Sequence, residues 1–273
     1  MLLLLAASWI YWLVAWWMTR VFFRSSRHAY QDYTPGVSIL KPVRGLDAQA
    51  LRNYASFCRQ EYPCYELLFG FSDLEDPAVH LVRQLQNDYP HTCIRLICGP
   101  ALGTNRKASL IHYMAAEARH DILVVSDSDM RVTPDYLRRV VAPLADPSTG
   151  LVTCCYRAEA PRTLAAGLEA QQIGAVFLPS VIIANCLFKF GFAMGSTAAL
   201  RRRDLARLGG FKAITDYLAD DYQLGARIAQ TGLRVHLSDY VVATVLGKTG
   251  FVEQWHREVR WSRCARVSRP WCY

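Results

Sequence analysis

The sequence lacks the short motifs that define several common protein classes. It has no C-x-x-C pair and no zinc-finger spacing, and its nine cysteines are an odd number. It also lacks an aromatic-and-basic RNA-binding signature and any repeat at solenoid spacing. With 16 glycines and 12 prolines, the 273 residues are not collagen-like or low-complexity. These absences argue against a zinc protein, a disulfide framework and a nucleic-acid partner, and they favour reduced thiols.

Nucleotide-binding glycine loops are missing as well. The first predicted strand is followed by Lys41-Pro-Val-Arg-Gly45, where a dinucleotide fold would carry G-x-G-x-x-G. There is no P-loop either. Both the dehydrogenase and the Walker-type interpretations therefore lose their main support.

The overall composition is that of a folded chain. Hydrophobic residues make up 52%, charged residues 20%, and the mean hydropathy is +0.07. These values exclude a disordered chain and a polytopic membrane protein. The net charge of +8 indicates an anionic partner. Without a nucleic-acid module, membrane head groups or a phosphorylated substrate are the remaining choices.

The first 19 residues carry no charge and are followed by Arg20, Arg24 and Arg27. About 20 apolar residues span the ~30 Å hydrocarbon layer, and tryptophans favour its interfaces. We therefore expect a single-pass transmembrane helix at residues 1–24, with the rest of the chain on the cytoplasmic side by the positive-inside rule. A cleaved signal peptide is the alternative.

The body alternates strands and helices. Continuous apolar strands between amphipathic helices predict an α/β, Rossmann-like domain with a mostly parallel sheet and flanking helices. The expected organisation is a linker at 25–35, a catalytic domain at 36–250, and a basic helix and interfacial tail at 251–273. We predict strands at 37–41, 66–72, 94–98, 121–126 and 151–156, and helices at 47–60, 76–88, 105–119 and 134–144.

Acidic residues follow two of these strands, at the sheet edge where such folds bind ligands. Asp127 and Asp129 can hold a divalent cation on a diphosphate, since Mg²⁺ and Mn²⁺ prefer oxygen ligands. A surface turn is the alternative. Asp73 and Asp76 can accept hydrogen bonds from a nucleoside, although Asp76 before Pro77 also suits a helix cap.

Two further groups stand later in the chain. Asp220 and Asp221 are adjacent, and repulsion between them can raise one pKa towards that of a general base; a solvated helix face is the alternative. Arg257 and Arg260 can grip a diphosphate beside Trp261; a membrane-surface helix is the alternative. The apolar residues 173–188 suit either an interfacial or acceptor-lining segment or a buried core helix.

The order Asp76, D-x-D at 127–129, Asp-Asp at 220–221 and R-x-x-R-W at 257–261 resembles that of inverting GT-A glycosyltransferases of family 2 type. Five other segments resemble the ceramide glucosyltransferase-like branch, which includes hopanoid-associated bacterial enzymes. These segments are Gly36–Pro42, Tyr62–Glu66, Asp76–Ala78, Gly103–Lys107 and Gly195–Ser196.

The resemblance implies a GT-A fold and transfer of glucose or N-acetylglucosamine from a UDP-sugar to a membrane lipid hydroxyl. It implies that Asp221 is the base, supported by Asp220. It assigns the donor and its Mg²⁺ or Mn²⁺ to Asp73, Asp76, Lys107, Asp127, Asp129, Arg257, Arg260 and Trp261. The alternatives are a processive polysaccharide synthase and a truncated, inactive nucleotide-sugar-binding membrane protein.

Overall fold

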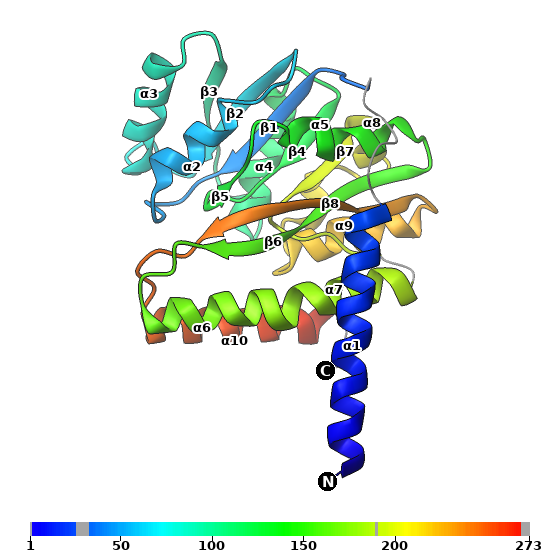
Figure 1. Ribbon diagram of the computed structural model, residues 1–273. Coiled ribbons are helices and arrows are strands. Elements are labelled where there is room, and N and C mark those ends of the chain that lie inside the picture. The colour runs from blue at the N-terminus through cyan, green and yellow to red at the C-terminus, as the bar shows by residue number, and fades with distance from the viewer. Residues whose placement is uncertain (1, 26–32, 189–190, 269–273) are drawn as a thin grey trace.

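The computed structural model of the chain describes residues 2–25, 33–188 and 191–268. Most of the linker expected at 25–35 and the end of the basic tail, residues 269–273, lie outside the described residues. Over the described ranges, eight strands form one sheet in the order β3-β2-β1-β4-β7-β6-β8-β5, with helices packed on both faces (Figure 1).

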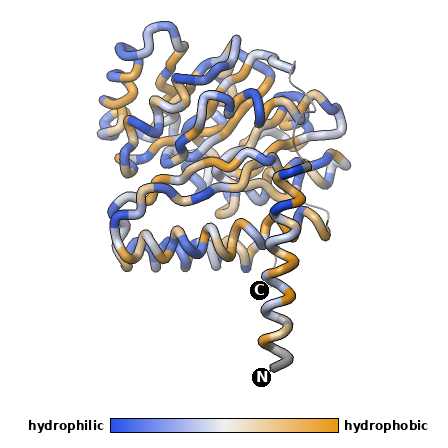
Figure 2. The backbone as a smooth tube through the Cα atoms, viewed as in Figure 1, coloured by the Kyte–Doolittle hydropathy of each residue, from blue (hydrophilic) through white to orange (hydrophobic). Residues whose placement is uncertain are grey.

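The first half of the sheet is parallel. It contains β1 (Val37–Pro42), β2 (Tyr65–Phe71), β3 (Cys93–Cys98) and β4 (Ile122–Val125). Alternate strand residues serve two cores: Val37 and Ile39 face α2, α3 and α5, while Leu40 faces α4. These helices are α2 (Ala50–Phe57), α3 (Ala78–Asp88), α4 (Arg106–Glu117) and α5 (Tyr136–Val141), the last followed by η1 (Ala142–Ala145). Strands β1, β2 and β4 are almost entirely buried, and hydrophobic stretches run through the sheet in Figure 2.

The second half of the sheet is mixed. It contains β5 (Met130–Arg131), β6 (Thr149–Glu159), β7 (Ala198–Arg201) and β8 (Arg234–Val245). β7 runs antiparallel between β4 and β6, whereas β6 and β8 are parallel. The α/β prediction is confirmed, and the sheet remains mostly parallel. We did not predict β5, β7 or β8. Strands β5 and β7 span only two and four residues, and the apolar residues of β8 are interrupted by Ser238 and Asp239. The remaining elements are α8 (Arg202–Ala206), η3 (Phe211–Ile214), α9 (Asp220–Gln230) and α10 (Phe251–Ser268).

Two apolar helical segments lie at the lower side of the domain (Figure 1). The first, α1 (Leu2–Ser25), projects away from the sheet. The second is continuous through α6 (Leu164–Gln172), the π-helical η2 (Ile173–Phe177) and α7 (Leu178–Leu187). Among the described residues, only Leu164–Leu187 is long and apolar enough to cross a membrane, judged by length and composition.

The transmembrane helix expected at residues 1–24 is therefore not supported by this criterion, which selects another segment. Of the expected residues, those from Leu2 onward form the helix α1. Tryptophan and tyrosine, which favour membrane interfaces, occupy positions 9, 11, 12, 16 and 17 of α1.

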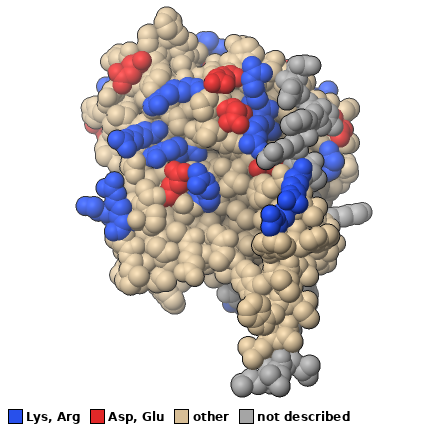
Figure 3. All heavy atoms as spheres, viewed as in Figure 1, with Lys and Arg blue, Asp and Glu red and all other residues tan. Residues whose placement is uncertain are grey.

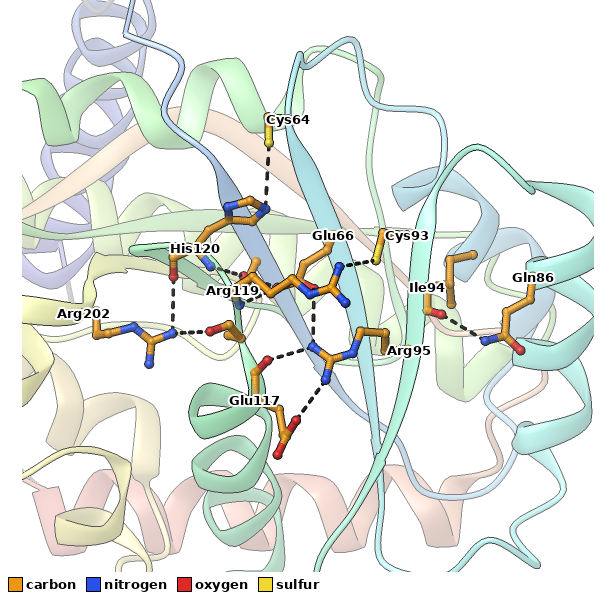
Figure 4. A network of polar contacts seen from close by, with 12 residues as sticks. Cys64, Glu66, Gln86, Cys93, Ile94, Arg95, Glu117, Arg119, His120 and Arg202 are labelled. Atoms are coloured by element: carbon orange, nitrogen blue, oxygen red, sulfur yellow. Dashed lines mark hydrogen bonds and ion pairs between the residues drawn. The ribbon is translucent and has the colours of Figure 1, made fainter.

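A polar network lies at the edge of the sheet formed by the amino ends of β1 to β3 (Figure 4). The buried Glu66 accepts hydrogen bonds from Ser38 Oγ (2.7 Å) and from the backbone N–H of Arg119 (2.7 Å). Arg95 lies between Glu66 and Glu117, with an Nη2–Oε2 distance of 2.9 Å to Glu117. This network joins α4 to the strands, and it lies away from the edge that carries the acidic motifs.

Candidate active site

The D-x-D segment turns directly out of β4, where it is fixed from three sides. The Asp127 backbone N–H donates to Gly195 O (3.3 Å), and Lys41 Nζ donates to Asp127 O (2.8 Å). Thr244 Oγ1, on β8, donates to Asp129 Oδ2 (2.8 Å). The carboxyl end of β4 therefore presents both carboxylates at the edge that we predicted for ligand binding.

Lys107 joins the D-x-D segment to the later acidic pair. Its Nζ lies 2.6 Å from Asp127 Oδ1 and 3.6 Å from Asp220 Oδ2. Asn105, the N-cap of α4, donates from Nδ2 to Asp220 Oδ1 (3.3 Å) and accepts from the backbone N–H of Ala108 (3.0 Å). The structure thus brings together three groups that are far apart in the sequence.

Asp221 is the second residue of α9, beside this bridge, and it is half-buried. Burial raises its pKa to about 6, and repulsion from Asp220 adds to the rise, while Lys107 opposes it. Its Oδ1 accepts from the Tyr222 backbone N–H (2.8 Å). Asp221 is therefore more basic than an ordinary aspartate.

Two charged residues at this edge were missed at the level of sequence. Ser128 Oγ donates to Asp47 Oδ2, and burial raises the pKa of Asp47. Lys41 is fully buried over the Phe57 ring, 3.7 Å from its centroid. Burial lowers the Lys41 pKa to about 7 against the attraction of Asp127, Asp129 and Asp47. A single acidic residue after a glycine-containing loop does not indicate a functional site. The place of Asp47 beside the D-x-D segment is therefore evident only from the structure.

Tyr156, on β6, was also missed. Its ring packs against that of Phe177, with centroids 5.0 Å apart. Burial raises its pKa, and the charges of Asp221, Asp129 and Asp127 raise it further. A tyrosine inside an apolar strand looks like an ordinary core residue, which is why the sequence did not indicate it.

Asp76 and Asp73 make backbone contacts. Asp76 accepts from the Gly45 N–H (2.7 Å, Oδ2) and from the Ala78 N–H (2.9 Å, Oδ1). Asp76 thus binds the first backbone N–H of α3, although the N-cap position of that helix is Pro77 and not Asp76 as predicted. Asp73 Oδ1 accepts from the Glu75 N–H (2.9 Å), and its side chain is exposed. Contact of either residue with a nucleoside stays a prediction.

The arginines of α10 lie in different surroundings. Arg257 Nη2 contacts the buried Glu169 at 2.6 Å and Thr249 Oγ1 at 2.9 Å, while its Nε is buried without a hydrogen-bond partner. Arg260 is exposed, and Trp261 is half-buried. Arg260 borders a groove of about 460 Å³ whose other lining residues are Leu218, Trp255, His256, Val259 and Arg263. The groove reaches the loop just before α9, and the diphosphate roles of these residues stay predictions.

The carboxylates offer a partial set of ligands for a divalent cation. Burial raises the pKa of Asp129 to about 6, and repulsion from Asp127 and then Asp47 adds to the rise. Over the described ranges, no three His, Cys, Asp or Glu side chains gather closely enough to hold a metal ion. Mg²⁺ and Mn²⁺ accept one or two carboxylates together with phosphate oxygens and water. The D-x-D segment fits a cation of that kind.

Solved structures share this architecture. A mannosyltransferase from Pyrobaculum calidifontis, in complex with GDP-Man and Mn²⁺, superimposes with a TM-score of 0.63 at 22% identity, covering 93% of this chain and 75% of that one. TarS residues 1–349 from S. aureus, in complex with UDP-GlcNAc, gives 0.53 at 12% identity, covering 79% and 60%. The chain therefore has the α/β fold of GT-A glycosyltransferases.

The family follows from sequence comparison. Glycosyl transferase family 21 matches residues 1–273, and the chain belongs to that family. Ceramide glucosyltransferase 3 of Caenorhabditis elegans is 29% identical over 208 residues, which are 76% of this chain and 45% of the relative. Beta-monoglucosyldiacylglycerol synthase of Synechocystis is 24% identical over 240 residues, which are 84% and 47%. The chain spans about half the length of these relatives.

Proposed function

We propose that this protein is an inverting glycosyltransferase that moves glucose or N-acetylglucosamine from a UDP-sugar to the hydroxyl of a membrane lipid. One observation carries the proposal: Lys107 bridges Asp127 and Asp220, so the D-x-D segment and the Asp220-Asp221 pair share one site. The names of two relatives, which combine glucosyl transfer with ceramide or diacylglycerol, support a lipid acceptor.

The side chains divide the reaction between them. Asp221 would take the proton from the acceptor hydroxyl as its oxygen attacks the sugar C1 from the face opposite the diphosphate. A single displacement then inverts the anomeric centre. Asp127 and Asp129 would hold Mg²⁺ or Mn²⁺, which neutralises the charge that develops on the leaving diphosphate. Lys107 is half-buried next to Asp127 and would add a fixed positive charge there.

Membrane attachment completes the proposal. The exposed residues of α1 are mostly apolar or aromatic, including Trp9 and Ile10, and the helix extends away from the domain (Figure 1). We place α1 as a single-pass anchor with the catalytic domain on the cytoplasmic side, because Arg20 and Arg24 lie at its domain end. The acceptor would then reach Asp221 from the bilayer.

Product analysis tests the function. Membranes containing the protein are incubated with labelled UDP-glucose or UDP-N-acetylglucosamine and a lipid extract, and the lipids are identified by mass spectrometry. We expect one discrete glycolipid with an inverted anomeric centre. A long polymer would favour the processive synthase, and no product with either donor would favour an inactive binding protein.

The Asp221→Asn variant tests the base. General bases contribute roughly 10²- to 10⁴-fold, so we expect a loss of that size in kcat. Binding of the UDP-sugar, followed by calorimetry, is expected to survive. Normal turnover by this variant would remove Asp221 from the mechanism.

A further inference from the structure

The apolar helix Leu164–Leu187 is held along the sheet at both ends. At its start, the N-cap Thr163 accepts from the Ala166 N–H (3.1 Å) and donates to the backbone of Thr249, just before α10. Beyond its end, the Met194 N–H donates to Thr153 Oγ1 of β6 (2.9 Å). A crossing helix has its ends on opposite sides of a ~30 Å layer. If this helix crossed the membrane, β6 would be drawn into the hydrocarbon layer. The contacts at the two ends of the helix are therefore not those of a membrane-spanning segment.

The inner face of this helix belongs to the protein core. Val181 and Ile182 are buried with Phe22 of α1, Cys155 of β6 and Leu237 of β8. The outer face is different: five apolar side chains are 47% to 71% exposed. They are Leu164, Leu168, Val176, Leu187 and Phe188.

Charge is absent from this outer face. Residues 164–188 contain one ionisable acid or base among Asp, Glu, Lys and Arg, namely Glu169. Glu169 is buried and paired with Arg257, so it does not reach the outer surface. In the space-filling view, few Lys, Arg, Asp or Glu side chains lie on the band below the sheet or on the projecting α1. Many lie on the surface above them (Figure 3).

Helix α10 widens the surface, because it lies beside α6. The two are joined by the Arg257–Glu169 pair and by Gln172 Nε2 donating to Glu258 (3.2 Å). No residue of α10, all of which the structure describes, is buried. Its apolar residues Phe251, Val252, Trp255 and Val267 are 59% to 69% exposed, and exposed arginines stand between them: Arg260, Arg263 and Arg266.

This composition identifies the kind of partner. Tryptophan and arginine interspersed with aliphatic residues are typical of helices that lie in the plane of a membrane interface. A second copy or another protein segment would not account for α1, which leaves the domain on this same side (Figure 1). Its base packs on α7 through Met18, Phe22 and Phe23.

We propose that the outer faces of α6–η2–α7 and α10 rest flat on a phospholipid bilayer, so that Leu164–Leu187 lies along the membrane surface and does not cross it. We name this surface the bilayer-facing shelf. The inference does not depend on which sugar is transferred, or on whether transfer occurs.

Nitroxide depth measurements test the shelf. The full chain is reconstituted in phosphatidylcholine–phosphatidylglycerol vesicles with one label at Leu168→Cys, Val176→Cys or Leu187→Cys, all exposed positions. Leu74→Cys, exposed on the loop after β2, is the matched control. Native cysteines that are at least partly exposed are replaced by serine: Cys64, Cys93, Cys98, Cys186 and Cys264. Cys272, which lies outside the described residues, is replaced as well. Collisions with oxygen, which dissolves in hydrocarbon, and with a water-soluble nickel complex report the depth of each label.

We expect the three shelf labels to lie at one shallow depth, with the nickel collision rate reduced several-fold relative to Leu74→Cys. A maximum depth at Val176→Cys with shallow flanking labels would mean that the helix crosses, and would overturn the proposal. Nickel collision rates equal to those of the control would also overturn it. Shielding from both reagents would overturn it too, since protein would then cover the face. None of these outcomes depends on activity, so the proposed function is tested separately.

Discussion

Among the side chains of the candidate site, Asp221 has the most direct pH dependence. A base works only when ionised, and burial together with Asp220 raises the Asp221 pKa to about 6. We therefore expect kcat/KM to fall about tenfold per pH unit below pH 6 and to level off above it. The Asp220→Asn variant removes the repelling charge, so its acidic limb should move to lower pH. An unshifted limb in that variant would contradict the assignment.

Gly195 tests how tightly Asp127 is held. A Cβ at this position would lie 2.6 Å from Asp127 Oδ2 and 3.3 Å from Lys107 Nζ. Gly195→Ala must therefore displace the carboxylate, and we expect donor affinity to fall at least tenfold while the melting temperature changes little. Gly167→Ala is the control, because a Cβ there meets nothing within 4 Å. Unaltered UDP-sugar binding in Gly195→Ala, measured by calorimetry, would show that Asp127 does not contact the donor.

The acidic residues of this site were predictable, but their partners were not. Asp127, Asp129 and Asp220-Asp221 stand out because paired carboxylates follow apolar segments. Lys41 and Tyr156 lie inside strands, and a residue within an apolar strand is normally interpreted as part of the core. Their proximity to the carboxylates depends on how β1, β6 and β8 are arranged, and no local pattern encodes that arrangement.

At the level of helices and strands, the parallel half of the sheet was foreseen to within a few residues. Strands β1 to β4 and helices α2 to α5 repeat a strand-helix unit with clear periodicity. The second half was less predictable, because β5 and β7 are short and pair antiparallel through contacts distant in sequence. Strand β8 was missed although it has twelve residues, since Ser238 and Asp239 interrupt its apolar pattern. The apolar helix at 164–187 was seen only in part, from residue 173 onward, since the polar residues of α6 conceal its start.

The ion pair between Glu169 and Arg257 governs how α10 is attached. Arg257 is one-third exposed and Glu169 is buried, so Arg257→Gln leaves an unpaired buried carboxylate. Allowing for partial screening, we expect a loss of about 1–2 kcal/mol, or a melting temperature lower by roughly 2–8 °C.

Trypsin should then cut faster at Arg260 and Arg263 of α10. The double variant Arg257→Gln, Glu169→Gln is expected to regain most of the stability, because the uncompensated charge is gone. A double variant no more stable than the single one would mean that the pair does not dock α10.

Across the whole molecule, the arrangement of α1 relative to the sheet suggests two kinds of membrane contact. Helix α1 extends away from the domain, whereas α6–η2–α7 and α10 lie crosswise at its base (Figure 1). An anchor resists extraction at high pH, but a surface contact does not. The two contacts therefore give different results in the same fractionation experiment.

Charges placed on α1 should separate these contributions. Ile10 and Leu13 are 61% and 62% exposed, so lysines there leave the packing at Phe22 intact. Each lysine in a membrane-spanning helix costs about 3 kcal/mol, so Ile10→Lys with Leu13→Lys should release the protein from membranes washed with alkaline carbonate. The unmodified chain and Leu74→Lys, a matched exposed site on the domain, should stay in the pellet. If the double variant also stays, α1 is not the anchor, and attachment must come from elsewhere in the chain.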